Sequence, residues 1–265
     1  MIRSLVFDKD GVILDLVETW FPVMQVLAEY TLTLQPNPTA RVLTRADLLD
    51  AIGVDDASGH IDPLGVCAAG SFRDIRAAWQ TLLPSDMTPL AENEGYQAEM
   101  RRLTRELVHG NAVPKGDVAT PLSRLTSAGF RIALLTNDSE ESARHGLEQL
   151  GILELFDPVI GADSGHGGKP EPHGLLHCIA AHGATPEEAL MIGDTNADFG
   201  AARAAAVADF ICIADSPDER PHADVSVENV IPRLSNLPDL LVRRGDMKQG
   251  CVLIHNRHVL RFRVR

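Results

Sequence analysis

The sequence opens with MIRSLVFDKDGV, residues 1–12. The apolar run at residues 5–7 ends at two carboxylates, Asp8 and Asp10, and a glycine follows. This pattern is typical of a buried strand that stops at a sharp turn and presents paired acids at its carboxyl end. Open parallel sheets bind ligands at such ends, where a carboxylate can act as a nucleophile or hold a hard cation. An ordinary acidic turn would have the same residues, so the interpretation depends on the later motifs.

Strand and helix patterns alternate along the second half of the chain. Apolar runs predict strands at residues 130–135, 158–160, 189–192 and 209–213. Helices are expected at residues 115–128, 139–150, 172–182 and 197–206. This alternation predicts an α/β fold, a doubly wound parallel sheet of the Rossmann-like kind with helices on both faces.

The gap between the first strand and the strand at residues 130–135 is too long for a single crossover helix. We therefore expect an inserted α-helical cap domain at residues 17–112, between two parts of the core at residues 1–16 and 113–240. Apolar spacing of three or four predicts cap helices at residues 20–30, 45–51, 71–83 and 90–109. A cap of this kind can close over a site and exclude water.

Composition limits the classes of function. The chain has 265 residues and a formal net charge of −13, which argues against nucleic acid or an anionic membrane as partner. No apolar run approaches the roughly 20 residues of a membrane span, and no targeting segment is expected before the first strand. The four cysteines form no metal-binding or disulfide pattern, which favours a reducing cytoplasm.

The end of the chain is charged oppositely to the rest. Residues 243–265 contain seven basic residues and one acid. We interpret residues 241–265 as a basic C-terminal tail that forms either a hairpin with one apolar and one basic face or a solvated extension. The tail carries no motif residue and could contribute to self-association, and we expect a monomer or a homodimer.

Four motifs lie at the ends of predicted strands. They are Asp8-Lys-Asp10, Thr136-Asn137-Asp138, Lys169-Pro170 and Gly193-Asp194-Thr-Asn-Ala-Asp198. At one sheet edge, Asp8, Asp10 and Asp194 would crowd negative charge, which Mg²⁺ would relieve. Thr136 and Asn137 can donate hydrogen bonds, and Lys169 supplies a compact positive charge. Together these groups suit a dianionic phosphoryl group.

In this order and spacing, the four motifs resemble those of the haloacid dehalogenase superfamily, and the inserted cap resembles that of its phosphoglycolate-phosphatase-like branch. The resemblance implies a magnesium-dependent phosphatase that hydrolyses a small phosphorylated metabolite, phosphoglycolate or a similar phosphomonoester, through an aspartyl-phosphate. It implies that Asp8 is the nucleophile and that Asp10 is the general acid and base. Asp8, Asp194 and the backbone carbonyl of Asp10 would bind Mg²⁺.

The resemblance also assigns roles to the remaining motif residues. Thr136 and Lys169 would hold the phosphoryl oxygens, and Asn137 would orient nearby groups. Asp198, one helical turn after Asp194, would lie on the same side of its helix and support the metal ligands without touching the ion.

Other residues near the motifs and in the cap have two interpretations each. Lys9 is either a surface charge, which we favour, or an extra partner for the phosphate, and Asp138 is interpreted as a helix cap. The candidate substrate contacts in the cap are Arg73, Arg76, His60 and Trp79. A cap arginine could pair with a carboxylate or second phosphate of the substrate. The alternative is a solvated helix face with the tryptophan in the cap core.

The position of Asp10 and the composition of the cap distinguish among reactions. Dehalogenases of the superfamily lack an acid at this position, because a halide leaves without a proton. Phosphonate-cleaving relatives use a cap lysine, and residues 17–112 contain no lysine. A phosphomutase of the β-phosphoglucomutase type remains an alternative. A catalytically silent binding relative is the other, although the intact motif acids and Lys169 weigh against it.

Overall fold

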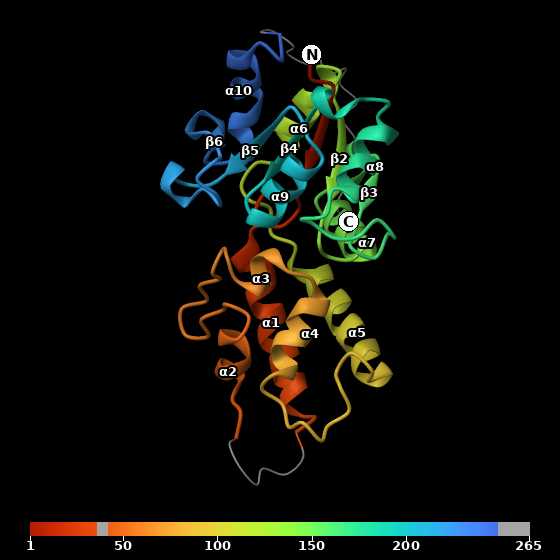
Figure 1. The fold of residues 1–265 in the computed structure, drawn as a ribbon, viewed down its shortest axis with the longest axis vertical. Coiled ribbons are helices and arrows are strands. Elements are labelled where there is room, and N and C mark those ends of the chain that lie inside the picture. The colour runs from red at the N-terminus through yellow and green to blue at the C-terminus, as the bar shows by residue number, and fades with distance from the viewer. Residues whose placement is uncertain (36–41, 249–265) are drawn as a thin grey trace, which may run out of the picture.

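The computed structural model describes residues 1–35 and 42–248. The chain forms a core built on one sheet and a helical cap that lies below the core in Figure 1. In the described part of the chain, none of the helices combines the length and the apolar character that crossing a bilayer requires.

The core sheet has six strands, all parallel, in the order β3-β2-β1-β4-β5-β6. The strands are β1 (Ser4–Phe7), β2 (Arg131–Leu135), β3 (Val159–Ile160), β4 (Ala189–Gly193), β5 (Asp209–Ile213) and β6 (Val230–Ile231). The predicted fold class, a doubly wound parallel sheet with an inserted helical cap, is confirmed. The sequence did not predict β6, which has only two residues and therefore no readable pattern.

Strand β1 lies at the point where the order of the strands reverses. Phe7 at its end is in register with Leu134 of β2 on one side and Ile192 of β4 on the other. The carboxyl ends of these three strands therefore meet at one place on the sheet edge. In open α/β sheets, this reversal point is where ligands bind.

Helices cover both faces of the sheet (Figure 1). They are α6 (Ala119–Ser127), α7 (Glu140–Gln149), α8 (His173–Ala181), α9 (Asn196–Ala204) and α10 (Leu237–Arg244), with 3₁₀ segments at Leu153–Leu155, Pro186–Glu188, Pro217–Glu219, Val227–Asn229 and Leu234–Asn236. Leu5 and Phe7 pack with α6, α7 and α10, whereas Val6 packs on the opposite face with α8 and α9. All of β1 is buried, as expected for a parallel strand covered on both sides.

The cap has a hydrophobic core of its own, separate from the two clusters on the sheet. Its helices are α1 (Leu16–Leu32), α2 (Arg45–Asp50), α3 (Val66–Ala69), α4 (Phe72–Gln80) and α5 (Glu94–Asn111). Trp79 is fully buried in this core and donates its indole N–H to the backbone carbonyl of Leu48 at 2.8 Å. The four predicted cap helices are present, and α3, a single turn, was too short for the pattern to predict.

The core continues past residue 240, where the sequence predicted that the tail begins. Helix α10 ends at Arg244, and Gly245 after it adopts the left-handed conformation that glycine allows at a helix end. Leu241 is fully buried, and Met247 also packs into the core. Arg244 donates to Asp209 at 2.9 Å and thereby ties the helix to β5. The predicted boundary at residue 240 is therefore too early, and the hairpin predicted within residues 251–265 lies outside the described residues.

We expect the Leu241→Ala substitution to destabilise the protein by about 2–5 kcal/mol, because removing a buried leucine side chain leaves a cavity. Urea unfolding followed by circular dichroism measures this change. Leu64→Ala is the matched control, since Leu64 is exposed. A loss of stability no larger than that of the control would contradict the assignment of α10 to the core.

Candidate active site

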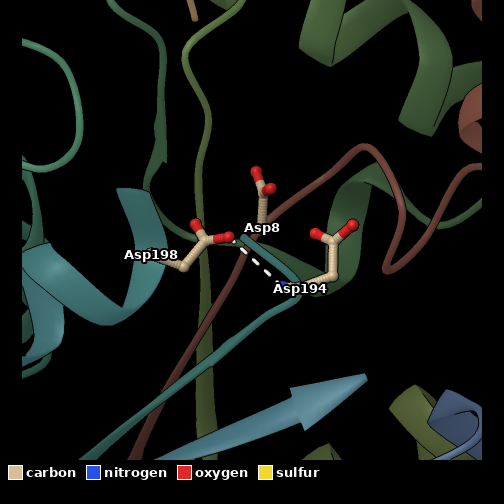
Figure 2. Close-up of side chains that lie close together, drawn as sticks. All are labelled: Asp8, Asp194 and Asp198. Carbon is tan, nitrogen blue, oxygen red and sulfur yellow. Dashed lines mark hydrogen bonds between the residues drawn. The ribbon is translucent and has the colours of Figure 1, made fainter. Parts of the chain in front are cut away.

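Three carboxylates converge at the carboxyl edge of the sheet (Figure 2). Asp8 follows β1, Asp194 follows β4, and Asp198 lies in the first turn of α9. One oxygen of each lies within 4.8 Å of the others. The helix cap fixes Asp198, whose Oδ2 accepts hydrogen bonds from the Thr195 hydroxyl at 2.6 Å and from the backbone N–H of Asp194 at 3.2 Å. Asp198 is thereby held beside Asp194.

The ammonium group of Lys169 bridges two of these acids. Its Nζ lies 2.6 Å from Asp8 Oδ1 and 2.6 Å from Asp198 Oδ1, and the side chain is almost completely buried. Asn137 holds the lysine backbone, because its Oδ1 accepts from the Lys169 N–H at 2.7 Å and its Nδ2 donates to the Lys169 carbonyl at 3.0 Å. Asn137 and Lys169, which the sequence predicted from different loops, thus lie together, and Lys169 reaches Asp8.

Asp10 belongs to a second buried cluster. The ammonium of Lys9 lies 2.5 Å from Asp138 Oδ2 and 3.2 Å from Asp10 Oδ2. Trp20, in cap helix α1, donates its indole N–H to Asp10 Oδ1 at 2.6 Å. The indole ring also lies 5.1 Å from the Lys9 ammonium, within the range of a cation–π interaction. Both oxygens of Asp10 are therefore engaged, one of them by the cap.

Two interpretations from the sequence are wrong at this cluster. Lys9 is not a surface charge, because its side chain is completely buried between two carboxylates. Asp138 is not the cap of α7. The cap is Ser139, whose hydroxyl accepts from the backbone N–H of Ser142 at 3.3 Å, while Asp138 pairs with Lys9.

Thr136 lies at the end of β2 and is 2% exposed. Its hydroxyl oxygen accepts a hydrogen bond from the backbone N–H of Asp138 at 3.1 Å. Because the oxygen is the acceptor in this bond, the hydroxyl hydrogen is available to donate to a ligand. Thr136 lines the same cavity as Asp8 and Lys169, as described below.

Gly11 makes room for Asp194. A Cβ atom on Gly11 would lie 1.9 Å from Asp194 Oδ2, and its φ of +78° is one that other residues rarely adopt. Lys115, at the start of the second core segment, donates to the Gly11 carbonyl at 2.7 Å. The sequence patterns did not indicate a role for Lys115 or Trp20. The signal for the lysine was its scarcity, since three of the four lysines in the chain lie at this site.

Burial and mutual repulsion change the acidity of these carboxyl groups. Burial raises the pKa of Asp8 to about 7, the charge of Asp198 raises it too, and Lys169 opposes them. Burial likewise raises the pKa of Asp194 well above its usual value, and the charges of Asp8 and Asp198 raise it further. Burial also raises the pKa of Asp10, against the effect of Lys9. A further positive charge beside Asp8 and Asp194 would favour their ionised forms.

The donor set fits a divalent cation such as Mg²⁺. Asp194 Oδ1 is buried, and within residues 1–35 and 42–248 no hydrogen-bond donor reaches it. Its neighbours Asp8 and Asp198 both have Lys169, so Asp194 is the acid of this group that still needs a partner. Mg²⁺ prefers carboxylate oxygens and commonly takes one or two from the protein.

Two adjoining cavities lie between the cap and the core. The smaller has a volume of about 40 Å³, and its walls include Asp8, Asp10, Thr136, Lys169, Trp20 and Phe72. The larger, of about 670 Å³, lies between cap helices α4 and α5 on one side and α7 with the glycine-rich loop on the other. Of the predicted cap contacts, Arg73 and Arg76 line the larger cavity. His60 lines neither, and Trp79 belongs to the cap core.

Comparison with known proteins identifies the family. A family model of haloacid dehalogenase-like hydrolases matches residues 2–206. The chain belongs to this family. This haloacid dehalogenase-like hydrolase is 43% identical over 84 residues to a phosphoglycolate phosphatase from Nitrosococcus oceani, a match that covers 32% of the chain and 37% of that relative. It is 27% identical over 206 residues to the pyrophosphatase PpaX from Listeria monocytogenes, covering 76% and 79% of the two chains.

The fold of the hydrolase is also that of solved relatives. The crystal structure of β-phosphoglucomutase from Clostridium difficile superposes with a TM-score of 0.62 at 17% identity, covering 92% of this chain and 96% of that one. The predicted membership in the haloacid dehalogenase superfamily is confirmed by the family match. Similarity to phosphoglycolate phosphatases from Nitrosococcus oceani and Cereibacter sphaeroides supports the predicted branch.

We expect Lys9→Met to destabilise the protein by about 3–5 kcal/mol at neutral pH, because it leaves Asp10 and Asp138 buried together without a counter-charge. The loss should shrink as the pH falls. The pKa of Asp10 is already raised in the folded protein, so as the pH falls the folded state binds a proton before the unfolded chain does. This proton removes the uncompensated charge and favours the folded variant.

Urea unfolding at about pH 5 and about pH 8 measures both effects. Lys248→Met serves as control, since Lys248 is exposed. A destabilisation by Lys9→Met that is equal at the two pH values, or larger at the lower one, would contradict the role given to Lys9.

Proposed function

We propose that this hydrolase is a magnesium-dependent phosphomonoesterase that works through an aspartyl-phosphate on Asp8. The observation that carries the proposal is the buried ammonium of Lys169, 2.6 Å from both Asp8 and Asp198. A phosphoryl dianion that enters the smaller cavity would meet this cation and the hydroxyl of Thr136.

In the proposed mechanism, Asp8 attacks phosphorus. Its Oδ1 accepts from the backbone N–H of Lys9 at 2.7 Å and binds Lys169, so we assign the attack to Oδ2. Oδ2 forms the new bond to phosphorus, the bond from phosphorus to the ester oxygen breaks, and its electron pair stays on the leaving oxygen. In the second step water attacks phosphorus and the Asp8 carboxylate is released.

Asp10 moves the protons of both steps. It donates a proton to the leaving oxygen in the first step and accepts one from the attacking water in the second. The Trp20 indole and the Lys9 ammonium bind its two oxygens and fix the orientation of the carboxyl group. Because Trp20 belongs to cap helix α1, the cap contributes one of the two contacts that orient Asp10.

The remaining residues bind and stabilise charge. Asp8, Asp194 and the backbone carbonyl of Asp10 would hold Mg²⁺, which supplies charge stabilisation to the phosphoryl oxygens when bound. Thr136 and Lys169 bind the same oxygens, since phosphoryl transfer depends mainly on positioning and electrostatics. Asn137 positions Lys169 through its backbone.

The substrate in this proposal is a small phosphorylated metabolite. Phosphoglycolate is the first compound to test, because the relative from Nitrosococcus oceani is a phosphoglycolate phosphatase.

Cys67, Cys178 and Cys212 are free, which supports a reducing compartment such as the cytoplasm. We expect a monomer or a homodimer.

A phosphomutase of the β-phosphoglucomutase type is the second candidate. The larger cavity favours it, since its volume of about 670 Å³ could hold a sugar phosphate in two orientations. A mutase would return the phosphoryl group from Asp8 to the sugar, whereas a hydrolase transfers it to water. Parallel assays of free phosphate and of glucose 6-phosphate formed from β-glucose 1-phosphate separate the two.

Asp8→Asn should abolish magnesium-dependent phosphate release from p-nitrophenyl phosphate, because the neutral amide cannot attack phosphorus. Excess chelator should abolish release by the unchanged protein. Asp215→Asn is the control, since that acid follows β5 and is exposed. Near-normal turnover by a folded Asp8→Asn protein would refute the mechanism.

Asp10→Asn should slow hydrolysis of an alkyl phosphate by roughly 10²–10⁴-fold, the usual range for losing a general acid. The effect on p-nitrophenyl phosphate should be much smaller, because nitrophenolate leaves without a proton. The ratio of kcat values for the two substrates is the measurement. Equal slowing of both would remove Asp10 from the role of acid.

A further inference from the structure

The proposed catalytic steps take place in the smaller cavity and leave the larger cavity without a ligand. The larger cavity shares Ser71, Phe72, Asn137, Asp138 and Lys169 with the smaller cavity, so the two adjoin at the catalytic end. A volume of about 670 Å³ is in the range that suits ligands much larger than a phosphoryl group. Phosphoglycolate has one methylene group between its ester oxygen and its carboxylate and would fill little of this space.

The wall contributed by the cap is strongly positive in a chain of net negative charge. From α4 and α5 it presents four arginines and one aspartate, and these are Arg73, Arg76, Arg101, Arg105 and Asp74. Two of the arginines are paired. Arg105 lies 3.5 Å from Glu141 of α7, and Arg73 lies 3.8 Å from Asp74.

The other two arginines, Arg76 and Arg101, have no carboxylate partner among the described residues. Within the described residues, no carboxylate lies within 4.0 Å of the guanidinium of Arg76 or Arg101. The Nε of Arg76 is buried and lacks a hydrogen-bond acceptor. Burial lowers the pKa of Arg76, and the charges of Arg101 and Arg73 lower it as well. A buried donor without an acceptor and adjacent like charges are both unfavourable, and an anion would relieve both.

The acids on the core side of the cavity do not supply that anion. They are Asp138, Glu141, Asp163 and Glu171, and in the described part of the chain none of them lies within 4.0 Å of the Arg76 or Arg101 guanidinium. Asp138 is bound to Lys9, and Glu141 is bound to Arg105. The positive charge of Arg76 and Arg101 therefore faces the cavity without a paired acid from the core.

The position of Arg76 sets the size of the ligand. Phe72, at the junction of the two cavities, and Arg76 lie four residues apart on the same face of α4, which separates them by about 6 Å along the helix. The backbone of Arg76 is therefore about one helical turn beyond the junction, and the apolar side chains of Met100 and Val108 line the cavity on the α5 side.

We propose that Arg76 and Arg101 bind a second anionic group of the substrate, so that the substrate is a phosphomonoester of at least sugar size with a further phosphate or carboxylate at its far end. This inference rests on the proposed phosphomonoesterase activity, and it names the class of substrate that the site prefers. It places phosphoglycolate below the preferred size.

Three probes on one glucose scaffold test the inference. They are glucose 6-phosphate, which has no second anion, 6-phosphogluconate, which has a carboxylate, and glucose 1,6-bisphosphate, which has a phosphate. We expect kcat/KM for phosphate release to be at least about tenfold higher for one or both of the doubly anionic probes than for glucose 6-phosphate, the effect of one charge-assisted contact. Phosphoglycolate should be the poorer substrate by a similar factor.

The double variant Arg76→Gln/Arg101→Gln should lose this preference, mainly through a higher KM for the doubly anionic probes. The ratio of their kcat/KM to that of glucose 6-phosphate should then fall toward one. Arg102→Gln is the control, because Arg102 is also on α5 but binds Glu99 and Glu106 at the surface. If the double variant does not fold, Arg101→Gln alone, at an exposed position, should reduce the preference.

Equal kcat/KM for all three glucose probes, or a preference unchanged in the double variant, would overturn the inference while leaving the phosphomonoesterase intact. Phosphoglycolate as the best substrate would overturn it as well. If no probe and no aryl phosphate releases phosphate, the proposed function fails. Calorimetric binding of glucose 1,6-bisphosphate then decides the inference alone: the unchanged protein should bind at least about tenfold more tightly than the double variant, and equal binding would overturn it.

Discussion

Two buried lysines hold together a group of carboxylates that could not otherwise be buried side by side. Lys169 joins Asp8 to Asp198, and Lys9 joins Asp10 to Asp138. Burial opposes the charge of each ammonium, but the neighbouring aspartates outweigh it and raise the pKa of both lysines. Each buried ion costs several kcal/mol in lost hydration, so the two pairs are a condition for the fold at this edge as well as for any chemistry there.

The sheet explains why these groups can meet. Asp8 and Asp194 follow adjacent strands at the point where the strand order reverses. Gly11 has no side chain, and a side chain at this position would collide with Asp194. Lys169 comes from the loop after β3 and reaches the same point because Asn137 binds its backbone. The result is a rigid arrangement in which positive and negative groups alternate. Such pre-organisation is the main way in which proteins stabilise transferring phosphoryl groups.

The cap takes part in this arrangement through specific contacts. Trp20 donates to Asp10, Asn137 donates to the Ala69 carbonyl of α3 at 3.1 Å, and Arg105 pairs with Glu141 of the core. The first contact fixes a proposed catalytic carboxyl group, and the second fixes the residue that holds Lys169. Cap position and the geometry of the site are therefore coupled, and the same interface forms the cavity that would enclose the organic part of the substrate.

Sequence patterns predicted the sheet, four of the cap helices and the four motifs, because strand ends in an open sheet converge at a known edge. Sequence patterns did not predict the burial of a residue whose partner lies far away in the sequence. The partner of Lys9 is Asp138, 129 positions away, and nothing near Lys9 in the sequence indicates that it is buried. The core position of Leu241 was missed because the basic residues after it suggested a solvated tail. The two-residue β6 and the single-turn α3 are too short for any periodicity.

In the proposed mechanism the phosphoryl group passes through Asp8, and mapping the phosphoenzyme tests this step. The protein is mixed with Mg²⁺ and p-nitrophenyl phosphate, quenched in acid during the first turnover, digested and analysed by mass spectrometry. We expect one added phosphoryl group on the peptide that contains Asp8, and none when Asp8→Asn is treated in the same way. A phosphoryl group on another residue, or rapid phosphate release with no covalent intermediate at any quench time, would contradict it.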